Sequence, residues 1–362
     1  MAGEFSAAAY AYDLPPELIA RKPPARRGDS RLLVLHRQSA ALEHKQFRAI
    51  LDYLAPPDLL VFNDTRVLPA RLLGQKVLPG NNRSGRARCE VFLLKQLDRK
   101  RWECLVKPGR RLPEGSVVSF GPDCSAGILD VLPDGRRLVE FEFAGDFQTV
   151  LDHYGRPPLP PYIKPDAAQS QSDRLELAAR YQTVYARVPG ASAAPTAGLH
   201  FSPELLAAIK TRGIPTAFLT LHIGLGTFQP LKTADIREHR MHTEEYILPA
   251  QTIRAVQACR QRGGRVIAVG TTAARVLETV AADIAASAVP AAGLAGCTSI
   301  YIYPGYKFRV VDALLTNFHL PGSTLLLLVS ALAGREKILQ AYQEAVRLRY
   351  RFFSFGDAML IV

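Results

Sequence analysis

Residues 192–228 read SAAPTAGLHFSPELLAAIKTRGIPTAFLTLHIGLGTF, and this stretch indicates the type of fold. Ser202 can cap a helix that has Pro203 in its first position, and Gly213 can end that helix. From Thr216 onward apolar and other residues alternate with a period of two, which predicts a strand. In α/β proteins, active sites form where such strands end near glycine.

Two histidines lie at the ends of these predicted elements. His200 comes just before the helix, and His222 lies near the carboxyl end of the strand. A histidine at either position can transfer protons near neutral pH. The alternative is that one or both only satisfy hydrogen bonds in the core, and the residues alone leave both interpretations open.

Composition indicates a soluble protein of about two domains with a basic surface. The chain has 362 residues, of which 48% are hydrophobic and 22% are charged. Lys and Arg number 45 against 33 Asp and Glu, a net charge of +12. This excess favours a polyanionic partner, RNA or DNA rather than a membrane. A basic proteome or a requirement for solubility would produce the same excess.

Cysteine spacing and apolar runs exclude several classes of protein. The five cysteines are far apart and form no CxxC pair, so neither a zinc ribbon nor a disulfide framework is indicated. The N-terminal residues lack a basic region followed by a long apolar core, and the apolar run at 325–332 is too short to span a bilayer. We therefore expect a cytoplasmic protein with no membrane partner.

The pattern of predicted secondary structure changes between residues 72 and 154. Short β-rich runs there alternate with turn signals such as Asp134-Gly135, which predicts a small β-barrel or sandwich. Helices and strands alternate on both sides of it. We therefore expect an α/β core domain formed by residues 1–71 and 155–362, interrupted by a β domain at 72–154. We also expect a strand at 299–303 and a polar loop at 166–173.

Two turns before helices can bind an anionic group. The sequence VGTT at 269–272 places Gly270, Thr271 and Thr272 at the start of a helix, where backbone N–H groups and hydroxyls are available. It is neither a dinucleotide fingerprint nor a P-loop. The sequence LLTNFHLPGST at 314–324 ends in a second helix start. Simple helix capping is the alternative at both turns.

Further polar residues fall in three short motifs. EHRMHTEEY at 238–246 contains His-x-x-His, but HExxH is absent and no further metal ligand is obvious, so we expect a polar pocket lining and no metal. FNDTR at 62–66 offers Asp64 and Arg66, although both residues could belong to a turn closed by a local ion pair. FFSFGDAM at 352–359 places Asp357 among aromatic residues, where a desolvated carboxylate can act as a general base.

Long strings of residues resemble one known family. YDLPPELIA, SRLLVLHR, LLVFNDTRVLPARLLG, RYQTVYA, AAPTAGLHF, LHIGLGTF, MHTEEY, VGTTAARVLE, LLTNFHLPGSTLLLLVSALAG and YRFFSFGDAMLI are similar to the S-adenosylmethionine:tRNA ribosyltransferase-isomerases of queuosine biosynthesis. The strings occur in order from Tyr12 to Ile361.

This resemblance implies a fold and a reaction. It implies a two-domain α/β protein whose core is a distorted α/β barrel, with a small β-barrel domain inserted. The enzyme would transfer and isomerise the ribosyl group of S-adenosylmethionine onto 7-aminomethyl-7-deazaguanine at the wobble position of tRNA, giving epoxyqueuosine, adenine and methionine. Because S-adenosylmethionine is consumed, no cofactor is expected, and nothing in the sequence demands more than a monomer.

The implied chemistry assigns tasks to residue types. A base must remove a C5′ proton, an acid should assist the departure of adenine, and another group must hold the methionine portion. We expect His200 or His222 to transfer protons, with Asp64 or Asp357 as the second choice, and Thr271 and Thr272 to bind the carboxylate. The expected substrate-binding residues are Arg66, Thr196, Gly224, Gly226, Thr227, His242, Gly270, Thr271, Thr272, Asn317, His319, Ser323 and Thr324.

Two other functions remain open from the sequence. One is an S-adenosylmethionine-dependent RNA methyltransferase, which would produce S-adenosylhomocysteine instead of free adenine and methionine. The other is a non-catalytic RNA-binding protein.

Overall fold

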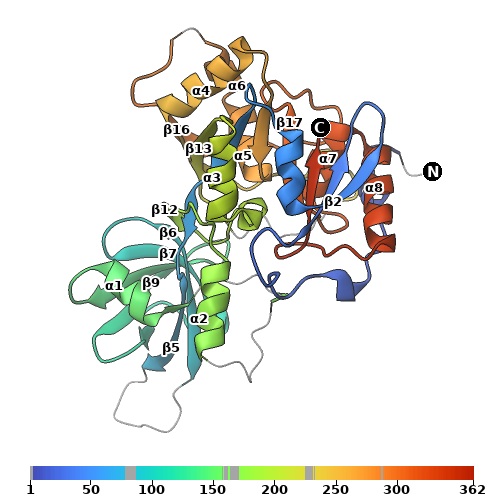
Figure 1. Ribbon diagram of the computed structural model, residues 1–362. Coiled ribbons are helices and arrows are strands. Elements are labelled where there is room, and N and C mark those ends of the chain that lie inside the picture. The colour runs from blue at the N-terminus through green and yellow to red at the C-terminus, as the bar shows by residue number, and fades with distance from the viewer. Residues whose placement is uncertain are drawn as a thin grey trace. The chain divides into compact units, whose positions relative to one another are not determined.

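The computed structural model describes residues 3–77, 87–156, 158, 162–163, 171–224, 231, 233–286 and 288–362, and only the backbone of 171–174. The chain forms two compact units (Figure 1). The core unit comprises Met1–Arg66, Pro160–Val188 and Ala194–Val362, and the barrel unit comprises Val67–Leu159 and Pro189–Ala193. The inserted unit thus begins and ends a few residues outside the predicted 72–154.

Nine strands in the described part of the chain form the sheet of the core unit, in the order β16-β14-β13-β3-β15-β17-β18-β1-β2. The neighbours β13, β3, β15 and β17 are parallel. The bounds are β1 Arg31–Leu35, β2 Leu42–Gln46, β3 Leu59–Asn63, β13 Thr216–Leu221, β14 Glu244–Leu248, β15 Val266–Val269, β16 Leu294–Thr298, β17 Ala313–Asn317 and β18 Ala358–Ile361.

Helices cover both faces of this sheet. On one face, alternate residues of β1, β3, β15, β17 and β18 pack against η3 (Phe47–Tyr53), η5 (Thr196–His200) and α3 (Pro203–Thr211). The helix α3 begins as predicted, because the Ser202 hydroxyl accepts a hydrogen bond from Leu205 N–H at 3.2 Å. The helices α4 (Ala250–Gln261) and α5 (Thr271–Thr279) contact β13, β3 and β15 but are absent from that cluster, so they cover the opposite face.

The connections from β3 and β15 leave the sheet in opposite directions. The chain reaches β13, on one side of β3, through α3, and it reaches β17, on the far side of β15, after α5. In open α/β sheets, ligands bind in the crevice at the carboxyl ends of two such strands. The topology therefore points to the edge at which β3 and β15 end.

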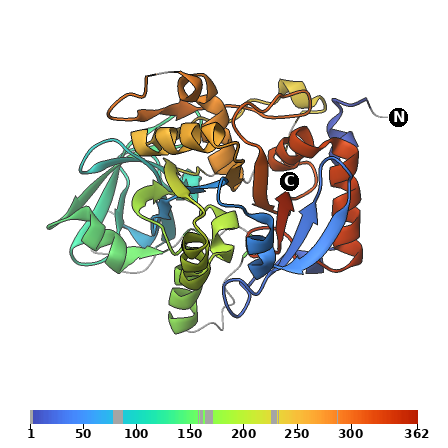
Figure 2. The ribbon, with the colours of Figure 1, turned by 45° about the horizontal axis from the view of Figure 1, so that its top comes forward.

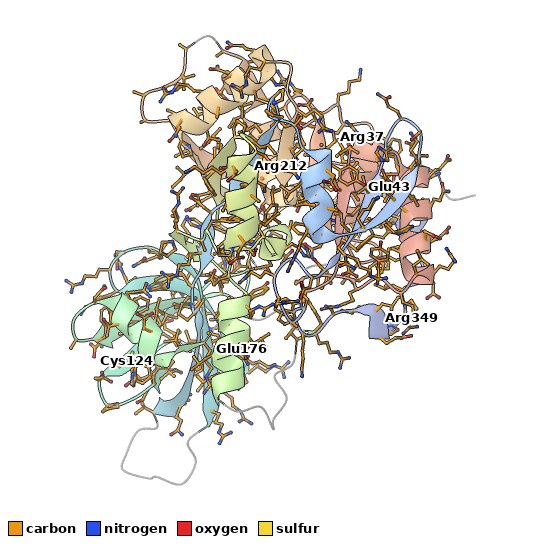
Figure 3. All side chains as sticks on the ribbon, viewed as in Figure 1. Arg37, Glu43, Cys124, Glu176, Arg212 and Arg349 are labelled. Carbon is orange, nitrogen blue, oxygen red and sulfur yellow. The ribbon has the colours of Figure 1, made fainter. Side chains whose placement is uncertain are left out.

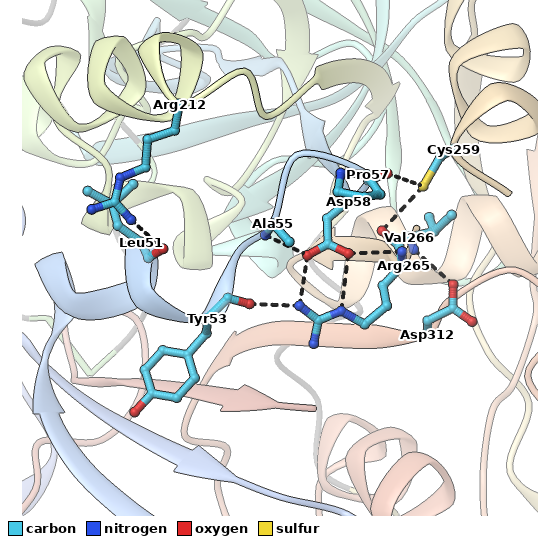
Figure 4. A network of polar contacts seen from close by, with 10 residues as sticks. All are labelled: Leu51, Tyr53, Ala55, Pro57, Asp58, Arg212, Cys259, Arg265, Val266 and Asp312. Carbon is cyan, nitrogen blue, oxygen red and sulfur yellow. Dashed lines mark hydrogen bonds and ion pairs between the residues drawn. The ribbon is translucent and has the colours of Figure 1, made fainter. Parts of the chain in front are cut away.

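The opposite edge of the same strands is fixed by a polar network (Figure 4). The Asp58 carboxylate accepts hydrogen bonds from Ala55 N–H and from the backbone and guanidinium of Arg265. Burial alone would raise the pKa of Asp58, but the contacts with Arg265 and the amides lower it. A side chain at Gly264 would place its Cβ 1.8 Å from the Pro57 carbonyl oxygen, so only glycine fits. The contacts at this edge therefore hold the starts of β3 and β15 together.

The barrel unit is a closed β-barrel. Its strands follow the order β11-β5-β6-β7-β10-β9-β8, and pairing of β5 with β8 closes the cylinder. Buried side chains fill it, among them Cys124 (Figure 3), and α1 (Phe147–Tyr154) packs into this core. The bounds are β5 Arg71–Val77, β6 Arg88–Gln96, β7 Arg101–Lys107, β8 Val117–Ser119, β9 Cys124–Val131, β10 Arg137–Phe143 and β11 Gly155–Arg156. The α/β class with an inserted β-barrel is confirmed.

The remaining elements are a small two-stranded sheet and several further helices. The strands β4 (Thr65–Val67) and β12 (Val188–Ala191) pair with each other in a separate sheet. The helices α7 (Thr324–Ala333) and α8 (Arg335–Arg347) lie side by side (Figures 1 and 2). The other bounds are η1 Ala7–Tyr10, η2 Pro16–Leu18, η4 Gly109–Arg111, α2 Gln171–Arg180, η7 Ile236–Glu238 and α6 Ala281–Ala285. No helix of the described chain is long and apolar enough to cross a membrane.

One predicted segment was wrong, and a second was wrong in the part that the structure describes. The strand expected at 299–303 lies instead at β16, because Leu294–Thr298 pairs along its whole length with β14. The hydroxyl of Tyr301 donates to the Ile236 carbonyl, so the aromatic residues after β16 pack in a loop. The polar loop expected at 166–173 overlaps the first turn of α2, which begins at Gln171, and residues 166–170 lie outside the described chain.

Candidate functional site

Polar residues gather where the four parallel strands of the core sheet end. Asn63 ends β3, His222 follows β13, Gly270 follows β15 and Asn317 ends β17. Neighbouring strands lie about 4.8 Å apart, so the edge from β13 to β17 spans about 14 Å. Most of the residues proposed from sequence in these segments therefore share one edge.

Asn63 ties three of these segments together and is fully buried. Its Oδ1 atom accepts hydrogen bonds from the N–H groups of Thr65 (3.1 Å) and Leu221 (3.0 Å). Its Nδ2 atom donates to the Leu221 carbonyl (3.0 Å) and to the Thr272 hydroxyl (3.2 Å). One side chain thus joins the ends of β3 and β13 to the first turn of α5.

Asp64 is buried and fully engaged by its neighbours. Its Oδ1 atom accepts from the Thr220 hydroxyl at 2.7 Å, and its Oδ2 atom pairs with the Arg187 guanidinium at 2.7 Å. Arg187 also lies over the ring of Phe218, with 5.0 Å between the guanidinium carbon and the ring centroid. The charge of the Asp64 carboxylate is therefore paired with a guanidinium in this structure.

His222 is half-buried at the end of β13. Its Nδ1 atom lies 2.8 Å from the Thr65 hydroxyl, which orients the ring. Burial lowers the pKa of His222, although the negative charges of Glu245 and Asp64 oppose this effect. The imidazole is therefore neutral near pH 7, as a proton acceptor must be.

His200 lies in a different environment, deep in the core. Its ring stacks on Phe47 with 4.9 Å between centroids, and its Nδ1 atom contacts the Ser30 hydroxyl at 2.7 Å. Burial lowers the pKa of His200 to about 4, while Asn317 opposes this lowering. Within the described residues, neither the Nε2 atom of His200 nor the Oδ1 atom of Asn317 makes a hydrogen bond of normal geometry.

A small pocket lies between η5, the start of α5 and the end of β17. Its lining includes the proposed residues Thr196, Gly270, Thr271, Thr272, Asn317 and His319, and its volume is about 50 Å³. Gly270 has a φ of +91°, which favours glycine and turns the chain into α5. The first N–H groups of a helix have no partner within the helix, so they can bind an anionic group here.

His319, Ser323 and Thr324 also have structural contacts. The Nε2 atom of His319 lies 3.0 Å from the Thr316 hydroxyl, and burial lowers the pKa of this histidine to about 3. The Ser323 hydroxyl accepts from Leu326 N–H at 3.3 Å and so caps α7, of which Thr324 is the first residue. The interpretation of this turn as a helix cap is thus confirmed, and the substrate contacts of these residues remain predictions.

Asp357 comes just before β18 and organises the backbone around it. Its carboxylate accepts from Arg31 N–H (2.8 Å) and Arg351 N–H (2.8 Å), and it pairs with the Arg31 guanidinium at 3.3 Å. With 2% exposure and three donors in place, it is held as a structural carboxylate here. Its role as a general base remains a prediction.

A buried ion pair supports the segment after His222. Glu244 on β14 pairs with Arg275 on α5, and both side chains are about 95% buried. Glu244 also accepts a hydrogen bond from Gly224 N–H at 3.2 Å. The proposed residue Gly224 is thus linked through Glu244 to the helix that begins with Thr271.

The other proposed residues lie apart from this cluster. Arg66 and His242 are exposed, and Gly226 and Thr227 lie outside the described residues. Among the residues that the structure describes, no group of three or more His, Cys, Asp or Glu side chains is arranged to hold a metal ion.

Sequence reasoning did not single out four important residues: Asn63, Thr65, Arg187 and Arg275. Their partners are far away in the chain, for example 158 residues between Asn63 and Leu221. No local pattern signals such contacts. The one available signal is position, since Asn63 and Thr65 flank the proposed Asp64 directly after a buried strand.

Comparison with known proteins shows which family this chain belongs to. The family model described as "Queuosine biosynthesis protein" matches residues 7–361. The S-adenosylmethionine:tRNA ribosyltransferase-isomerase of Pelotomaculum thermopropionicum is 53% identical, covering 97% of this chain and 98% of that protein. The protein of the same name from Natranaerobius thermophilus is 52% identical, covering 97% of each. The crystal structure of an S-adenosylmethionine tRNA ribosyltransferase from Thermotoga maritima is similar, with 38% identity, a TM-score of 0.54, and coverage of 98% of this chain and 100% of that chain.

Proposed function

Because this chain belongs to the queuosine biosynthesis protein family, we propose that it is an S-adenosylmethionine:tRNA ribosyltransferase-isomerase that works at the carboxyl edge of its core sheet. The observation that carries the proposal is the convergence of His222, the Gly270–Thr272 turn and Asn317 at the ends of parallel strands. Such an edge is where open α/β sheets bind their ligands.

The proposed reaction moves the ribosyl group of S-adenosylmethionine onto 7-aminomethyl-7-deazaguanine in the anticodon of tRNA. The adjacent sulfonium makes the C5′ proton acidic, so a neutral base can remove it. Isomerisation then gives epoxyqueuosine, and adenine and methionine leave. S-adenosylmethionine is a substrate in this scheme, and we propose that no separate cofactor takes part.

His222 is the residue best suited to proton transfer. It is half-buried, neutral near pH 7, and held at Nδ1 by Thr65, which leaves Nε2 for the substrate. His200 is only 4% exposed and has a pKa of about 4, so it could exchange protons only with a group that also enters the core. We therefore assign His200 to the packed core behind the pocket, where it contacts Ser30 and Phe47.

The Gly270–Thr272 turn is proposed to hold the methionine carboxylate. A pocket of about 50 Å³ is far smaller than the 300–1,000 Å³ of ordinary small-molecule sites, so it suits one end of a ligand and not a whole nucleoside. Its helix N-terminus favours a negative charge. The remainder of the substrate would then lie along the edge towards His222.

The test is incubation of the protein with S-adenosylmethionine and tRNA that carries 7-aminomethyl-7-deazaguanine, followed by nucleoside mass spectrometry. Epoxyqueuosine in the tRNA together with free adenine supports the proposal. Methylated tRNA with S-adenosylhomocysteine would indicate a methyltransferase, and unchanged tRNA would indicate a protein that only binds RNA. His153→Ala, at an exposed position on α1, is a matched control for changes to His222.

We also propose two further properties. We propose that the protein works in the cytoplasm, where its tRNA substrate would be found. Within the described residues, nothing in the site requires residues from a second copy. We propose a monomer, which light scattering of the purified protein would test.

A further inference from the structure

The barrel unit has a large open groove of about 1070 Å³ on its outer surface. Three neighbouring strands supply its floor, because Gln75 pairs with Arg88 across β5 and β6, and Glu90 pairs with Lys107 across β6 and β7. The interior of the barrel is formed by the alternate residues, including Cys89 and Val91. Side chains that point outward from β6 therefore line the groove.

Three exposed cations line this groove: Arg88, Lys107 and Arg156. Among the described residues, none of the three forms an ion pair with a carboxylate. The groove also contains the carboxylate of Glu90, but Arg71 neutralises it with a contact of 2.6 Å. The groove therefore carries a net positive charge.

Two other cations of the barrel are paired with carboxylates. Arg101 pairs with Asp98 at 2.6 Å, and Arg136 pairs with both Asp134 and Glu103. These pairs lie at the turns before β7 and before β10, at the opposite end of β7 from Lys107. Other cations without an ion pair among the described residues, such as Arg99, Lys100, Arg110 and Arg111, lie outside the groove lining. The groove is distinguished because it brings three unpaired cations together along one concave surface.

An aromatic ring completes the lining. Phe120 is half-buried, with its ring stacked on Phe141 at 6.0 Å between centroids, and it borders the groove together with Ser119. Grooves that bind RNA chains combine unpaired Arg and Lys for the phosphates with aromatic faces for the bases. An acidic protein partner would need the cations but no aromatic face at this position.

We propose that this groove binds the sugar-phosphate backbone of the RNA substrate, with Arg88, Lys107 and Arg156 contacting phosphates. The identity of the RNA as tRNA rests on the proposed function. The groove is lined by residues of the barrel unit alone, and we assign its contribution to the affinity for RNA and not to the chemical step.

The test compares two triple variants of the full-length protein. The groove variant carries Arg88→Gln, Lys107→Gln and Arg156→Gln, and the control variant carries Lys100→Gln, Arg101→Gln and Arg136→Gln. Both lose three positive charges of the barrel, and all six positions are exposed except Arg136, which is partly buried. The probe is an unmodified tRNA transcript, whose Kd is measured by fluorescence anisotropy from 0.05 to 0.3 M salt.

Counterion release gives the expected size of the effect. Each phosphate contact adds about 0.7 to 0.9 to the slope of log Kd against log salt concentration. One contact therefore tightens binding about five- to eightfold when the salt concentration falls from 1 M to 0.1 M. The groove variant should therefore bind about 100- to 500-fold more weakly at 0.1 M salt, with a salt slope reduced by about two to three. The control variant should keep the salt slope of the unmodified protein.

Three further measurements separate this inference from the proposed function. In the groove variant, KM for precursor tRNA should rise while kcat at saturating tRNA and binding of S-adenosylmethionine stay unchanged. Equal Kd and equal salt slope in the two variants would overturn the inference, even if epoxyqueuosine is formed. Weaker binding by the groove variant alone would support the inference, even if the unmodified protein forms no epoxyqueuosine, a result that would reject only the proposed reaction.

Discussion

Asn63→Asp tests how the strand ends of the core sheet are held together. The substitution keeps the shape and the acceptor oxygen of Asn63, but it places an oxygen where Nδ2 now donates to the Leu221 carbonyl at 3.0 Å. A buried carbonyl without its donor costs about 1–3 kcal/mol. A buried carboxylate without a cation adds several kcal/mol, because Asn63 is fully buried. We expect the free energy of unfolding of the core unit to fall by at least about 3 kcal/mol at pH 8.

The penalty should depend on pH. Burial and the facing carbonyl raise the folded-state pKa of the introduced carboxyl above the ordinary value of about 3.9. The folded state then binds the proton more tightly than the unfolded state. The charge-related penalty is therefore absent below the unfolded pKa and grows by about 1.4 kcal/mol per pH unit up to the folded pKa. The variant should be closest to the parent protein at pH 5 and furthest from it at pH 8.

Urea unfolding at both pH values measures this effect, and two signals separate the two units. The single tryptophan, Trp102, lies in the barrel, so its fluorescence should report an unchanged transition while the circular dichroism of the core shifts. Asn63→Ala serves as the comparison, because it loses the same hydrogen bonds without adding a titrating group. A loss below about 1 kcal/mol at pH 8, or a loss equal at both pH values, would refute the reasoning.

Three further outcomes are expected. His222→Ala should lower the rate of adenine release by about 10²- to 10⁴-fold without weakening calorimetric binding of S-adenosylmethionine, and near-normal turnover would contradict its role. His200 and His319, whose pKa values burial lowers to about 4 and about 3, contribute stability that is complete above pH 6.5 and is lost on acidification. Urea unfolding at pH 6.5 and 5.5 should therefore differ by about 2 kcal/mol, and an unchanged midpoint would exclude neutral buried histidines. Glu244→Gln leaves the charge of buried Arg275 unmatched and should cost about 3–5 kcal/mol in the same assay, whereas a cost below about 1 kcal/mol would mean that water reaches the pair.

Elements with local signals were predictable from the sequence. The caps Ser202 and Ser323 mark the starts of α3 and α7, and the glycine at 270 marks the start of α5. The alternating runs of the barrel also identified its strands, because hairpin pairing depends on residues close in sequence. The position of His222 at the end of β13 was predicted for the same reason.

Features that depend on distant contacts were not predictable. The segment Leu294–Thr298 contains Ala and Gly, which disfavour strands, yet it pairs with β14 as the edge of the sheet. The two histidines were indistinguishable in sequence, and only packing against Phe47 separates buried His200 from half-buried His222. The ion pair of Asp64 with Arg187 joins residues 123 positions apart, so the pairing of that carboxylate had no local signal.

The order of strands in the core sheet has a consequence for synthesis on the ribosome. β18 lies between β17 and β1, and Arg31 at the start of β1 bonds to Asp357, 326 residues later in the chain. The barrel, in contrast, is built almost entirely from one continuous segment and can fold as soon as that segment emerges. Loop closure over such a separation delays folding, so β1 can pair early with β2 but lacks its other neighbour until Ala358–Ile361 has left the exit tunnel. During that interval the nascent core exposes apolar strands, which makes the unfinished chain a substrate for chaperones.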